Sequence, residues 1–339
     1  MELGIYSTSH GLGYRDGENF FAKSITFDMM QPIEVAKKVE DADFHSMWFP
    51  DHVCMPVESS SGHVANASRT RAYESRHNML DAAVLMGAVA NATSTLKIGN
   101  TVLIAPYRGP LNDARQFATV DILSKGRLIL GVGAGWLEEE FSALGLSYQN
   151  RGEMTNECIE IYKRSWTDDV VEFHGSFYDF SGISMDPKPI QKPRPPIIFG
   201  SVVPAGARRA ARFCDGLYPL FLDPKADPFR FSNLQDIVRQ ELDTLERAHD
   251  SFSMIACASM RVQKDPFEGK ERPICTGSPE QVLSDLERLA KAGYSHVVAF
   301  YDCPSGQISE LLDQISITGN AIIPEAKKLV PDGGFNKTL

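Results

Sequence analysis

Short apolar runs rich in β-branched residues alternate along the chain with longer segments whose apolar positions recur at helical spacing. The runs predict eight strands: Leu3–Ser7, Ser46–Phe49, Leu96–Ile104, Arg127–Gly133, Ile197–Gly200, Gly216–Leu220, Ser253–Met260 and His296–Tyr301. The segments between and after them predict helices over Pro32–Asp41, Met79–Ala92, Pro110–Leu123, Met154–Thr167, Ala205–Phe213, Leu234–His249 and Ile308–Val330, with one more beginning at Ser278. Alternating strand–helix units predict a parallel sheet, and eight units suit a closed (β/α)8 TIM barrel.

Local signals refine these elements. Ser278 is typical of a helix N-cap, Gln281 completes a capping box, and Gly293 suits the end of that helix. Barrels of this type need about 250 residues, so the surplus length predicts insertions after strands 2 and 4. The first, Cys54–Arg76, is either a lid over the C-terminal face or an exposed loop. The segment Val170–Phe180 is predicted to form a hairpin, and the proline-rich residues 186–196 an extended connection.

Composition narrows the class of protein. The chain has 339 residues, 43% of them hydrophobic, which is ordinary for one globular domain over residues 1–339. A net charge of −10 disfavours nucleic acid as a partner. Six cysteines occur without a CxxC pair or zinc spacing, so we expect free thiols and no metal. The sequence shows no secretion signal and no apolar stretch long enough for a bilayer, which predicts a cytoplasmic protein with no membrane partner.

A glycine-rich segment ends the fourth strand. Gly131-Val132-Gly133-Ala134-Gly135 resembles a dinucleotide fingerprint, but Trp136 stands where the third glycine of GxGxxG belongs. We therefore expect a strand exit, Ala134 to Trp136, whose backbone approaches a flat ligand closely. The motifs GxxxxGK[ST], HExxH and GxSxG are absent from the sequence, which removes local support for Walker-loop, zinc-peptidase and α/β-hydrolase chemistry.

The second strand ends in Asp51-His52. A histidine at the C-terminal end of a barrel strand lies on the catalytic face and can move a proton near neutral pH. Asp51 would orient that imidazole or bind donors of a ligand. A solvated pair in an ordinary turn is an equally good interpretation of these two residues alone.

Several segments together resemble a known family, the bacterial luciferase-like flavin- and deazaflavin-dependent oxidoreductases. They are Asp51-His52, residues 98–102, Pro106-Tyr107-Arg108-Gly109-Pro110, the long stretch 118–136, Glu139-Glu140-Phe141, Arg151-Gly152, Phe173-His174-Gly175 and Pro195-Pro196-Ile197. They follow in order over the chain up to about Gly216. Only the central stretch is specific by itself.

The resemblance implies a barrel that holds FMN or coenzyme F420 at the C-terminal end of its strands. It implies that Thr101-Val102 forms a non-prolyl cis peptide behind the cofactor ring, and that Gly200-Ser201 takes the cofactor phosphate. Backbone N–H groups at a helix start also suit an anion on physical grounds. A small-molecule substrate, a separate flavin reductase and a homodimer are further expectations from the family. The choice between FMN and F420 stays open.

Candidate catalytic residues follow from the same placement. His52 would protonate or stabilise an anion near the central ring, and His10, just after the first strand, would line the same end of the barrel. Tyr14, Phe20 and Phe21 are expected in a packed loop. Sulfonate-oxidising relatives carry basic or imidazole residues on strand 7, whereas residues 255–260 here carry none, which favours an uncharged substrate. The alternatives are a non-redox barrel enzyme of the aldolase or isomerase type and a catalytically silent flavin-binding paralogue.

Overall fold

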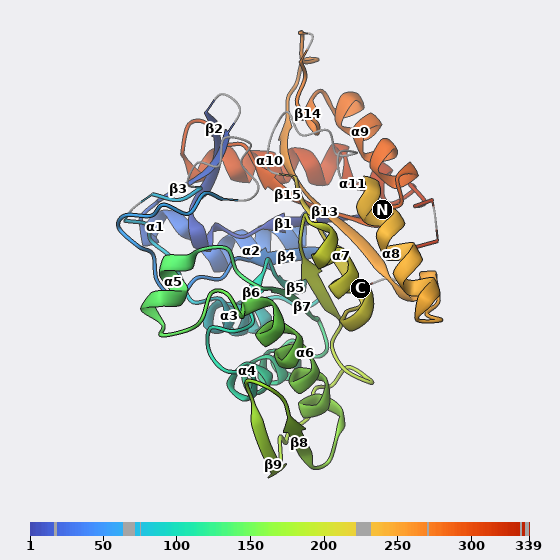
Figure 1. Ribbon diagram of the computed structural model, residues 1–339. Helices are drawn as coiled ribbons and strands as arrows, with labels where there is room; N and C mark the ends of the chain where they lie inside the picture. The colour runs from blue at the N-terminus through green and yellow to red at the C-terminus, as the bar shows by residue number, and fades with distance from the viewer. Residues whose placement is uncertain are drawn as a thin grey trace.

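The computed structural model describes residues 1–16, 19–63, 72–74, 76–221, 232–269, 271–332, 334–335 and 339. Its centre is a closed parallel barrel (Figure 1). The barrel strands are β1 (Glu2–Tyr6), β4 (Ser46–Phe49), β5 (Lys97–Asn100), β7 (Leu128–Gly133), β10 (Ile197–Gly200), β11 (Gly216–Tyr218), β13 (Ser253–Val262) and β15 (His296–Tyr301). They pair in this order, and β15 pairs with β1 to close the ring. The predicted (β/α)8 barrel is confirmed.

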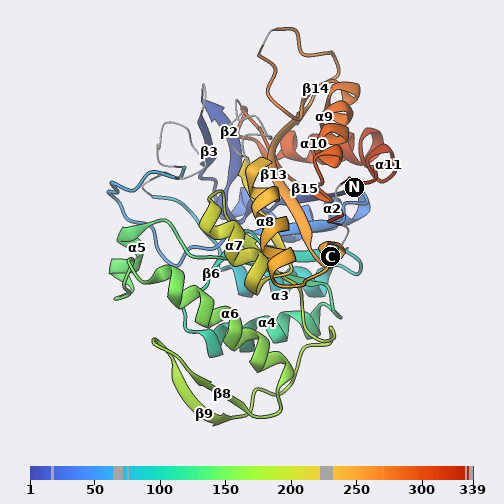
Figure 2. The same ribbon diagram turned by 45° about the vertical axis from the view of Figure 1, so that its right-hand side comes forward.

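Helices surround the strands in both views (Figures 1 and 2). They are α1 (Phe27–Met30), α2 (Pro32–Asp41), α3 (Ala82–Ala92), α4 (Pro110–Leu123), α5 (Glu138–Ala143), α6 (Arg151–Thr167), α7 (Pro204–Phe213), α8 (Ser232–Thr244), α9 (Pro279–Lys291), α10 (Ile308–Ala321) and α11 (Ile323–Ala326), with 3₁₀ turns at Thr8–His10 and His249–Ser251. None of the helices in the described ranges is long and apolar enough to cross a bilayer.

Large side chains fill the inside of the barrel. Trp48 of β4 and Tyr218 of β11 stack with 5.4 Å between ring centroids and an interplanar angle of 6°. A Cβ atom at position 99 would lie 2.6 Å from the Trp48 ring, so glycine at that position makes room for the indole. The barrel is therefore a packed core, and a ligand can enter only at the ends of the strands.

Two predicted strands are divided. The third consists of β5 and of β6 (Leu103–Ile104). In the ladder with β7, Ile98 pairs with Leu128 but Leu103 pairs with Val132, so the β5–β6 side has one extra residue and forms a bulge. The peptide between Thr101 and Val102 in this bulge is cis, as expected. The sixth consists of β11 and β12 (Leu220–Phe221), with Pro219 between them. Proline has no N–H to donate to a ladder.

The segment after β1 was wrongly predicted as a loop. It forms an antiparallel hairpin, β2 (Leu12–Asp16) with β3 (Asn19–Lys23). The Arg15 guanidinium pairs with Asp302 at 3.0 Å, beyond the end of β15. The Ala22 N–H donates to the Ala72 carbonyl at 3.0 Å, so the hairpin also holds part of the segment that follows β4.

The other local predictions are largely confirmed. The hairpin predicted over Val170–Phe180 is β8 (Val171–His174) with β9 (Asp179–Ile183), at the opposite end of the molecule from β2–β3 (Figures 1 and 2). The capping box of Ser278 and Gln281 forms at α9, and short β14 (Thr276–Gly277) precedes it. Helix α3 begins later than predicted because the Asp81 side chain caps it by accepting from Val84 N–H. The predicted C-terminal helix is divided into α10 and α11.

A buried carboxyl lies between α4 and α6. Asp113 is fully buried, and its Oδ2 accepts a hydrogen bond of 2.9 Å from the Tyr162 hydroxyl. Its Oδ1 has no partner among the described residues. Burial raises the pKa of Asp113 to about 7, against the smaller opposing effects of Tyr162 and Arg108. The charged form is therefore costly in this place.

We predict that Asp113→Asn stabilises the protein in a pH-dependent way. The folded-state pKa lies above the unfolded value of about 3.9, so the folded chain holds the proton more tightly. The contribution of this group to the free energy of unfolding is therefore lost as pH rises from about 4 to about 7. The melting temperature of the variant should exceed that of the wild type more at pH 8 than at pH 5. Exposed Asp41→Asn is the control, and a pH-independent difference for Asp113→Asn contradicts the prediction.

Candidate active site

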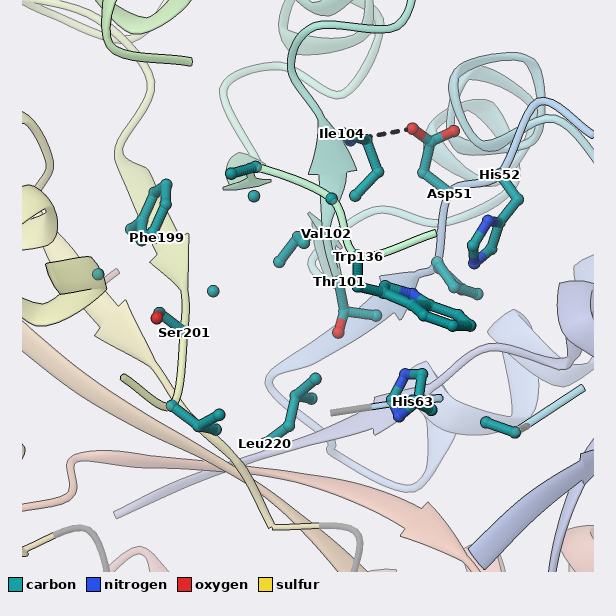
Figure 3. A pocket seen from close by; sticks show the side chains of 18 of the residues that line it. Asp51, His52, His63, Thr101, Val102, Ile104, Trp136, Phe199, Ser201 and Leu220 are labelled. Carbon is teal, nitrogen blue, oxygen red and sulfur yellow. Dashed lines mark hydrogen bonds between the residues drawn. The ribbon is translucent and has the colours of Figure 1, made fainter. Parts of the chain in front are cut away.

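A cavity of about 460 Å³ lies at the C-terminal ends of the barrel strands. Pockets of about 300–1,000 Å³ are typical of small-molecule sites. Its described lining comes from the exits of most barrel strands and from the β2–β3 hairpin, and Figure 3 shows part of it. Among the residues predicted from the sequence, it brings together Asp51, His52, Thr101, Val102, Ala134, Gly135, Trp136, Gly200 and Ser201.

The exit of β4 positions His52 at the cavity wall. Its Nδ1 lies 2.7 Å from Glu140 Oε2, and the two side chains are 5% and 0% exposed. The pKa of Glu140 is lowered, because the hydrogen bonds and charge of the neighbouring groups outweigh the effect of burial. Nδ1 therefore donates its proton to a carboxylate, and Nε2 is the ring nitrogen left for a ligand in the cavity.

Glu140 was not predicted as a site residue. It lies on the short helix α5, and its carboxylate also accepts from the Tyr107 hydroxyl at 3.0 Å and from the N–H groups of Val53 and Cys54 at 2.7 and 3.1 Å. The only signal in the sequence was the segment Glu139-Glu140-Phe141 within the family resemblance. That segment gave no reason to pair Glu140 with His52, 88 positions away.

Asp51 does not orient His52. Its two oxygens bind Arg108, at 2.6 and 2.8 Å, and Oδ2 also accepts from the Ile104 N–H at 3.1 Å (Figure 3). The carboxylate thus joins the exits of the second and third strands. Its acceptor capacity is largely used within the protein, which corrects the expectation that it orients the imidazole.

Val102 lies between two glycines at the bottom of the cavity. A Cβ atom at Gly133 would lie 2.5 Å from Val102 Cγ2, and one at Gly200 would lie 2.7 Å from Val102 Cγ1. A Cβ atom at Gly131 would lie 1.9 Å from the Asn100 carbonyl oxygen. Packing against the bulge of the third strand thus explains Gly131 and Gly133, where the sequence suggested only a ligand.

Two arginines form a cationic end of the cavity near the N-terminus of α7. Arg209 donates to the Asn156 amide oxygen at 2.6 Å, and Arg151 donates to the Gly135 and Tyr148 carbonyls at 3.3 and 2.8 Å. Neither has a carboxylate partner within the described ranges. Burial and the charge of Arg151 lower the pKa of Arg209. Neither arginine was predicted as a binding residue, although Arg151 lay in a segment of the family resemblance.

Ser201, which was predicted to take a cofactor phosphate, lines the same cavity as these arginines. Its hydroxyl occupies the space above Gly206, where an added Cβ would lie 1.9 Å from Oγ. Gly152 similarly leaves room for Arg209, whose Nη2 would be 2.9 Å from a Cβ at that position. The start of a ten-residue helix, a hydroxyl and two guanidinium groups together provide donors for an anion.

His10 does not line the cavity, which corrects its prediction as a residue at the barrel end. It lies in a 3₁₀ turn behind His52, with 5.9 Å between the ring centroids, and is 1% exposed. Burial, and then the neighbouring His52 and His77, hold the pKa of His10 well below its usual range. The Ser7 hydroxyl accepts from the Ser9 N–H at 3.3 Å and caps this turn, in which the His10 side chain is buried.

The segment after β4 is hydrogen-bonded to α5. The Ser60 N–H and the hydroxyl groups of Ser59 and Ser61 donate to Glu139 at 2.7, 3.1 and 2.8 Å. Residues 64–71 and 75 of the expected insertion lie outside the described residues, so its role as a lid stays a prediction.

Phe21 lines the cavity from β3; the side chain of Phe20 lies outside the described part.

We predict that Glu140→Gln moves the proton of His52 from Nδ1 to Nε2. The amide oxygen can still accept from the Val53 and Cys54 N–H groups, but the amide nitrogen then donates to Nδ1. Two-bond nitrogen–proton NMR spectra should show mainly the Nδ1–H tautomer in the wild type at high pH and mainly Nε2–H in the variant. Asp179→Asn, beside exposed His174, is the matched control. An unchanged His52 tautomer in Glu140→Gln would refute the assignment.

Comparison with known proteins places this geometry in a family. The model of the luciferase-like monooxygenases matches residues 1–229. An uncharacterized protein of Mycobacterium bovis is 34% identical over 192 residues, which cover 57% of this chain and 66% of that protein. The FMNH(2)-dependent dimethylsulfone monooxygenase of Pseudomonas putida is 36% identical over 138 residues, 40% of this chain and 36% of that enzyme. The F420-dependent glucose-6-phosphate dehydrogenase of Amycolatopsis mediterranei is 30% identical over 188 residues, which cover 54% of this chain and 51% of that enzyme.

Solved structures show the same fold at lower identity. An F420-dependent secondary alcohol dehydrogenase superposes with a TM-score of 0.71 at 20% identity, covering 96% of this chain and 98% of that one. The oxygenating constituent of the 3,6-diketocamphane monooxygenase of Pseudomonas putida gives a TM-score of 0.74 at 14% identity, and the superposition covers 98% of this chain and 100% of that one. The chain belongs to the luciferase-like monooxygenase family.

Proposed function

We propose that the protein is an oxidoreductase that binds reduced FMN or reduced F420 across the C-terminal end of the barrel and acts on a small uncharged organic substrate. The alignments with the curated relatives cover less than two thirds of each relative's length. The proposal therefore depends on the cavity itself. FMN and F420 are both supported, because relatives that use each of them resemble this chain.

The observation that carries the proposal is the pair of guanidinium groups at one end of the cavity. Arg151 and Arg209 are partly buried and lie close enough for one to lower the pKa of the other. A partly buried positive charge is stabilised by an anionic partner. Carbonyl and amide oxygens are their partners within the described residues. A phosphate monoester or diester of a cofactor supplies the missing negative charge.

The remaining cavity suits a flat ring. Val102 and Thr101 supply its bottom, and the Trp136 indole lies beside His52 with 6.2 Å between the ring centroids. When bound, either cofactor in its reduced form supplies two electrons, to a substrate directly or to dioxygen. The protein contributes position and exclusion of water.

His52 is the residue that we assign to proton transfer. Glu140 fixes its ring through Nδ1, so Nε2 gives or takes a proton at a constant position in the cavity. Asp51 supports this wall through Arg108 and has no assigned role in proton transfer. His10 is buried beside His52 and is not a lining residue of the cavity, so we assign it no contact with substrate.

A non-redox barrel enzyme has less support. The cavity contains no lysine among its described lining residues, and its one lining carboxylate, Asp51, is bound to Arg108. Schiff-base chemistry or a carboxylate pair therefore has no residues to carry it in this part of the chain.

A separate flavin reductase and a homodimer stay predictions. Val84, 75% exposed on α3, gives apolar surface that suits subunit contact.

We predict that Arg209→Gln weakens the binding of a phosphate-bearing cofactor. Loss of one charged hydrogen bond costs about 1.5–3 kcal/mol, which is about 10- to 100-fold in the dissociation constant of FMN or F420. Riboflavin and the phosphate-free deazaflavin chromophore should bind wild type and variant alike. Arg208→Gln, an exposed neighbour on the same helix, is the control. If the affinities for riboflavin and FMN fall equally, Arg209 does not recognise phosphate. Tight NAD(P)H binding without flavin binding would contradict the proposed function.

We predict that His52→Ala lowers turnover strongly and leaves cofactor affinity nearly unchanged. A positioned general acid or base contributes about 10²–10⁴-fold in rate. His52→Asn should retain hydrogen bonding but lose proton transfer, so its turnover should stay low while its melting temperature approaches that of the wild type. The measurements are the turnover number with a substrate that the wild type converts, and cofactor titration of each variant. Near-full turnover in His52→Ala would show that His52 is structural.

A further inference from the structure

The cavity has a second end, opposite the arginines. Around the barrel, β7 and β10 are the fourth and fifth strands, whereas β15, β1 and β4 are the eighth, first and second. Arg151, Arg209 and Ser201 follow the fourth and fifth strands. The second end is formed by residues of or after the eighth, first and second strands, namely Phe300, Tyr6, Phe21, His52, His63 and Tyr73. We call these six residues the aromatic end.

Near neutral pH, the buried polar groups of the aromatic end other than His52 are uncharged. Burial lowers the pKa of His63 to about 4, with a further contribution from His52, and the His63 side chain stays neutral. Burial raises the pKa of Tyr73 to about 12 and that of Tyr6 well above its usual range. Both phenols therefore keep their protons and hydrogen-bond as neutral groups.

No arginine or lysine of the described lining belongs to this end, because the two lining arginines are Arg151 and Arg209. His52 is the remaining titratable residue named at this end, and the Glu140 carboxylate already lies 2.7 Å from its Nδ1. From the described residues of this end, an anion would lose its hydration and find no positively charged partner in return. Within this part of the chain, the two ends of the cavity thus differ in the charge of the ligand group that each accepts.

Ring surfaces dominate the walls of the aromatic end. Tyr6 and Phe300 stack with ring centroids 4.3 Å apart. His63 meets the Trp136 ring edge-on at 4.8 Å, and His52 meets Tyr73 edge-on at 5.3 Å. Such faces and edges suit another flat ring better than a saturated chain of equal size. Polar atoms of His52, His63 and Tyr73 lie among these rings, so a ring with a polar group also fits.

We propose that the aromatic end binds an uncharged aromatic compound that carries a hydroxyl or carbonyl oxygen, with that oxygen on the side of His52. The inference rests on the proposed function, because it takes the arginine end for the cofactor phosphate and leaves the aromatic end for substrate. It extends that function by naming the class of substrate: phenols and aryl ketones or aldehydes, and not carboxylates, sulfonates or phosphates.

Three small probes of similar size test this inference in the wild-type protein. Acetophenone and benzoate differ mainly in charge, and cyclohexyl methyl ketone lacks the aromatic ring. Isothermal titration calorimetry near neutral pH, without cofactor and again with saturating FMN or F420, should give at least about tenfold tighter binding for acetophenone than for benzoate. Acetophenone should also bind about threefold or more tighter than cyclohexyl methyl ketone.

The outcomes separate the two proposals. Benzoate binding as tightly as acetophenone would overturn the uncharged class, and equal binding of cyclohexyl methyl ketone would overturn the aromatic one. Displacement of bound cofactor by acetophenone, or no binding of any probe, would overturn the assignment of this end to substrate. Cofactor titration is read separately, so failure to bind FMN and F420 contradicts the proposed function whatever the probes do.

A matched pair of phenylalanine variants locates the probe. Phe21→Ala, on the β2–β3 hairpin over the aromatic end, should weaken acetophenone binding about three- to tenfold and change cofactor affinity less than about twofold. Phe27→Ala removes a side chain that is 62% exposed outside the cavity and should change neither. Equal acetophenone affinity in the wild type and both variants would place the probe elsewhere and refute the inference.

Discussion

The buried carboxylate of Glu140 is the interaction on which the arrangement of the site depends. A fully buried charge is very costly unless hydrogen bonds surround it. Here the donors come from the loop after β4, through His52, Val53 and Cys54, and from the loop after β6, through Tyr107. Glu140 itself belongs to the segment after β7. Hydrogen bonds to one carboxylate thus join three neighbouring strand exits, and movement of either donor loop removes part of what stabilises its charge.

The barrel topology keeps different chemistry at separate places in one cavity. Consecutive strands stand side by side, so residues that follow the fourth and fifth strands lie across the ring from those that follow the eighth and first. The two arginines stand at one side, and the neutral His63 and the phenols of Tyr6 and Tyr73 at the other. Among the described residues, a long ligand with one anionic terminus therefore has a single favourable orientation. The orientation of such a ligand follows from the positions of the charges, and no further contact is needed to fix it.

The periodic pattern of the sequence predicted the barrel well, because buried parallel strands and amphipathic helices leave strong local signals. Helix caps such as Ser278 were predictable for the same reason. The His52–Glu140 pair was not, because its members lie on different strand exits and only closure of the barrel brings them together. The pattern equally failed to show that the His10 side chain is buried beside His52 and does not line the cavity. The β2–β3 hairpin was missed because its pairing depends on distant anchors such as Asp302.

The two glycines around Val102 have an evolutionary consequence. Positions 102, 133 and 200 share one small volume, so the residue tolerated at each depends on the other two. A side chain added at 133 or 200 would overlap the methyl groups of Val102 unless these shift or are lost. In a lineage that reshapes this part of the cavity, substitutions at the three positions are therefore coupled by packing.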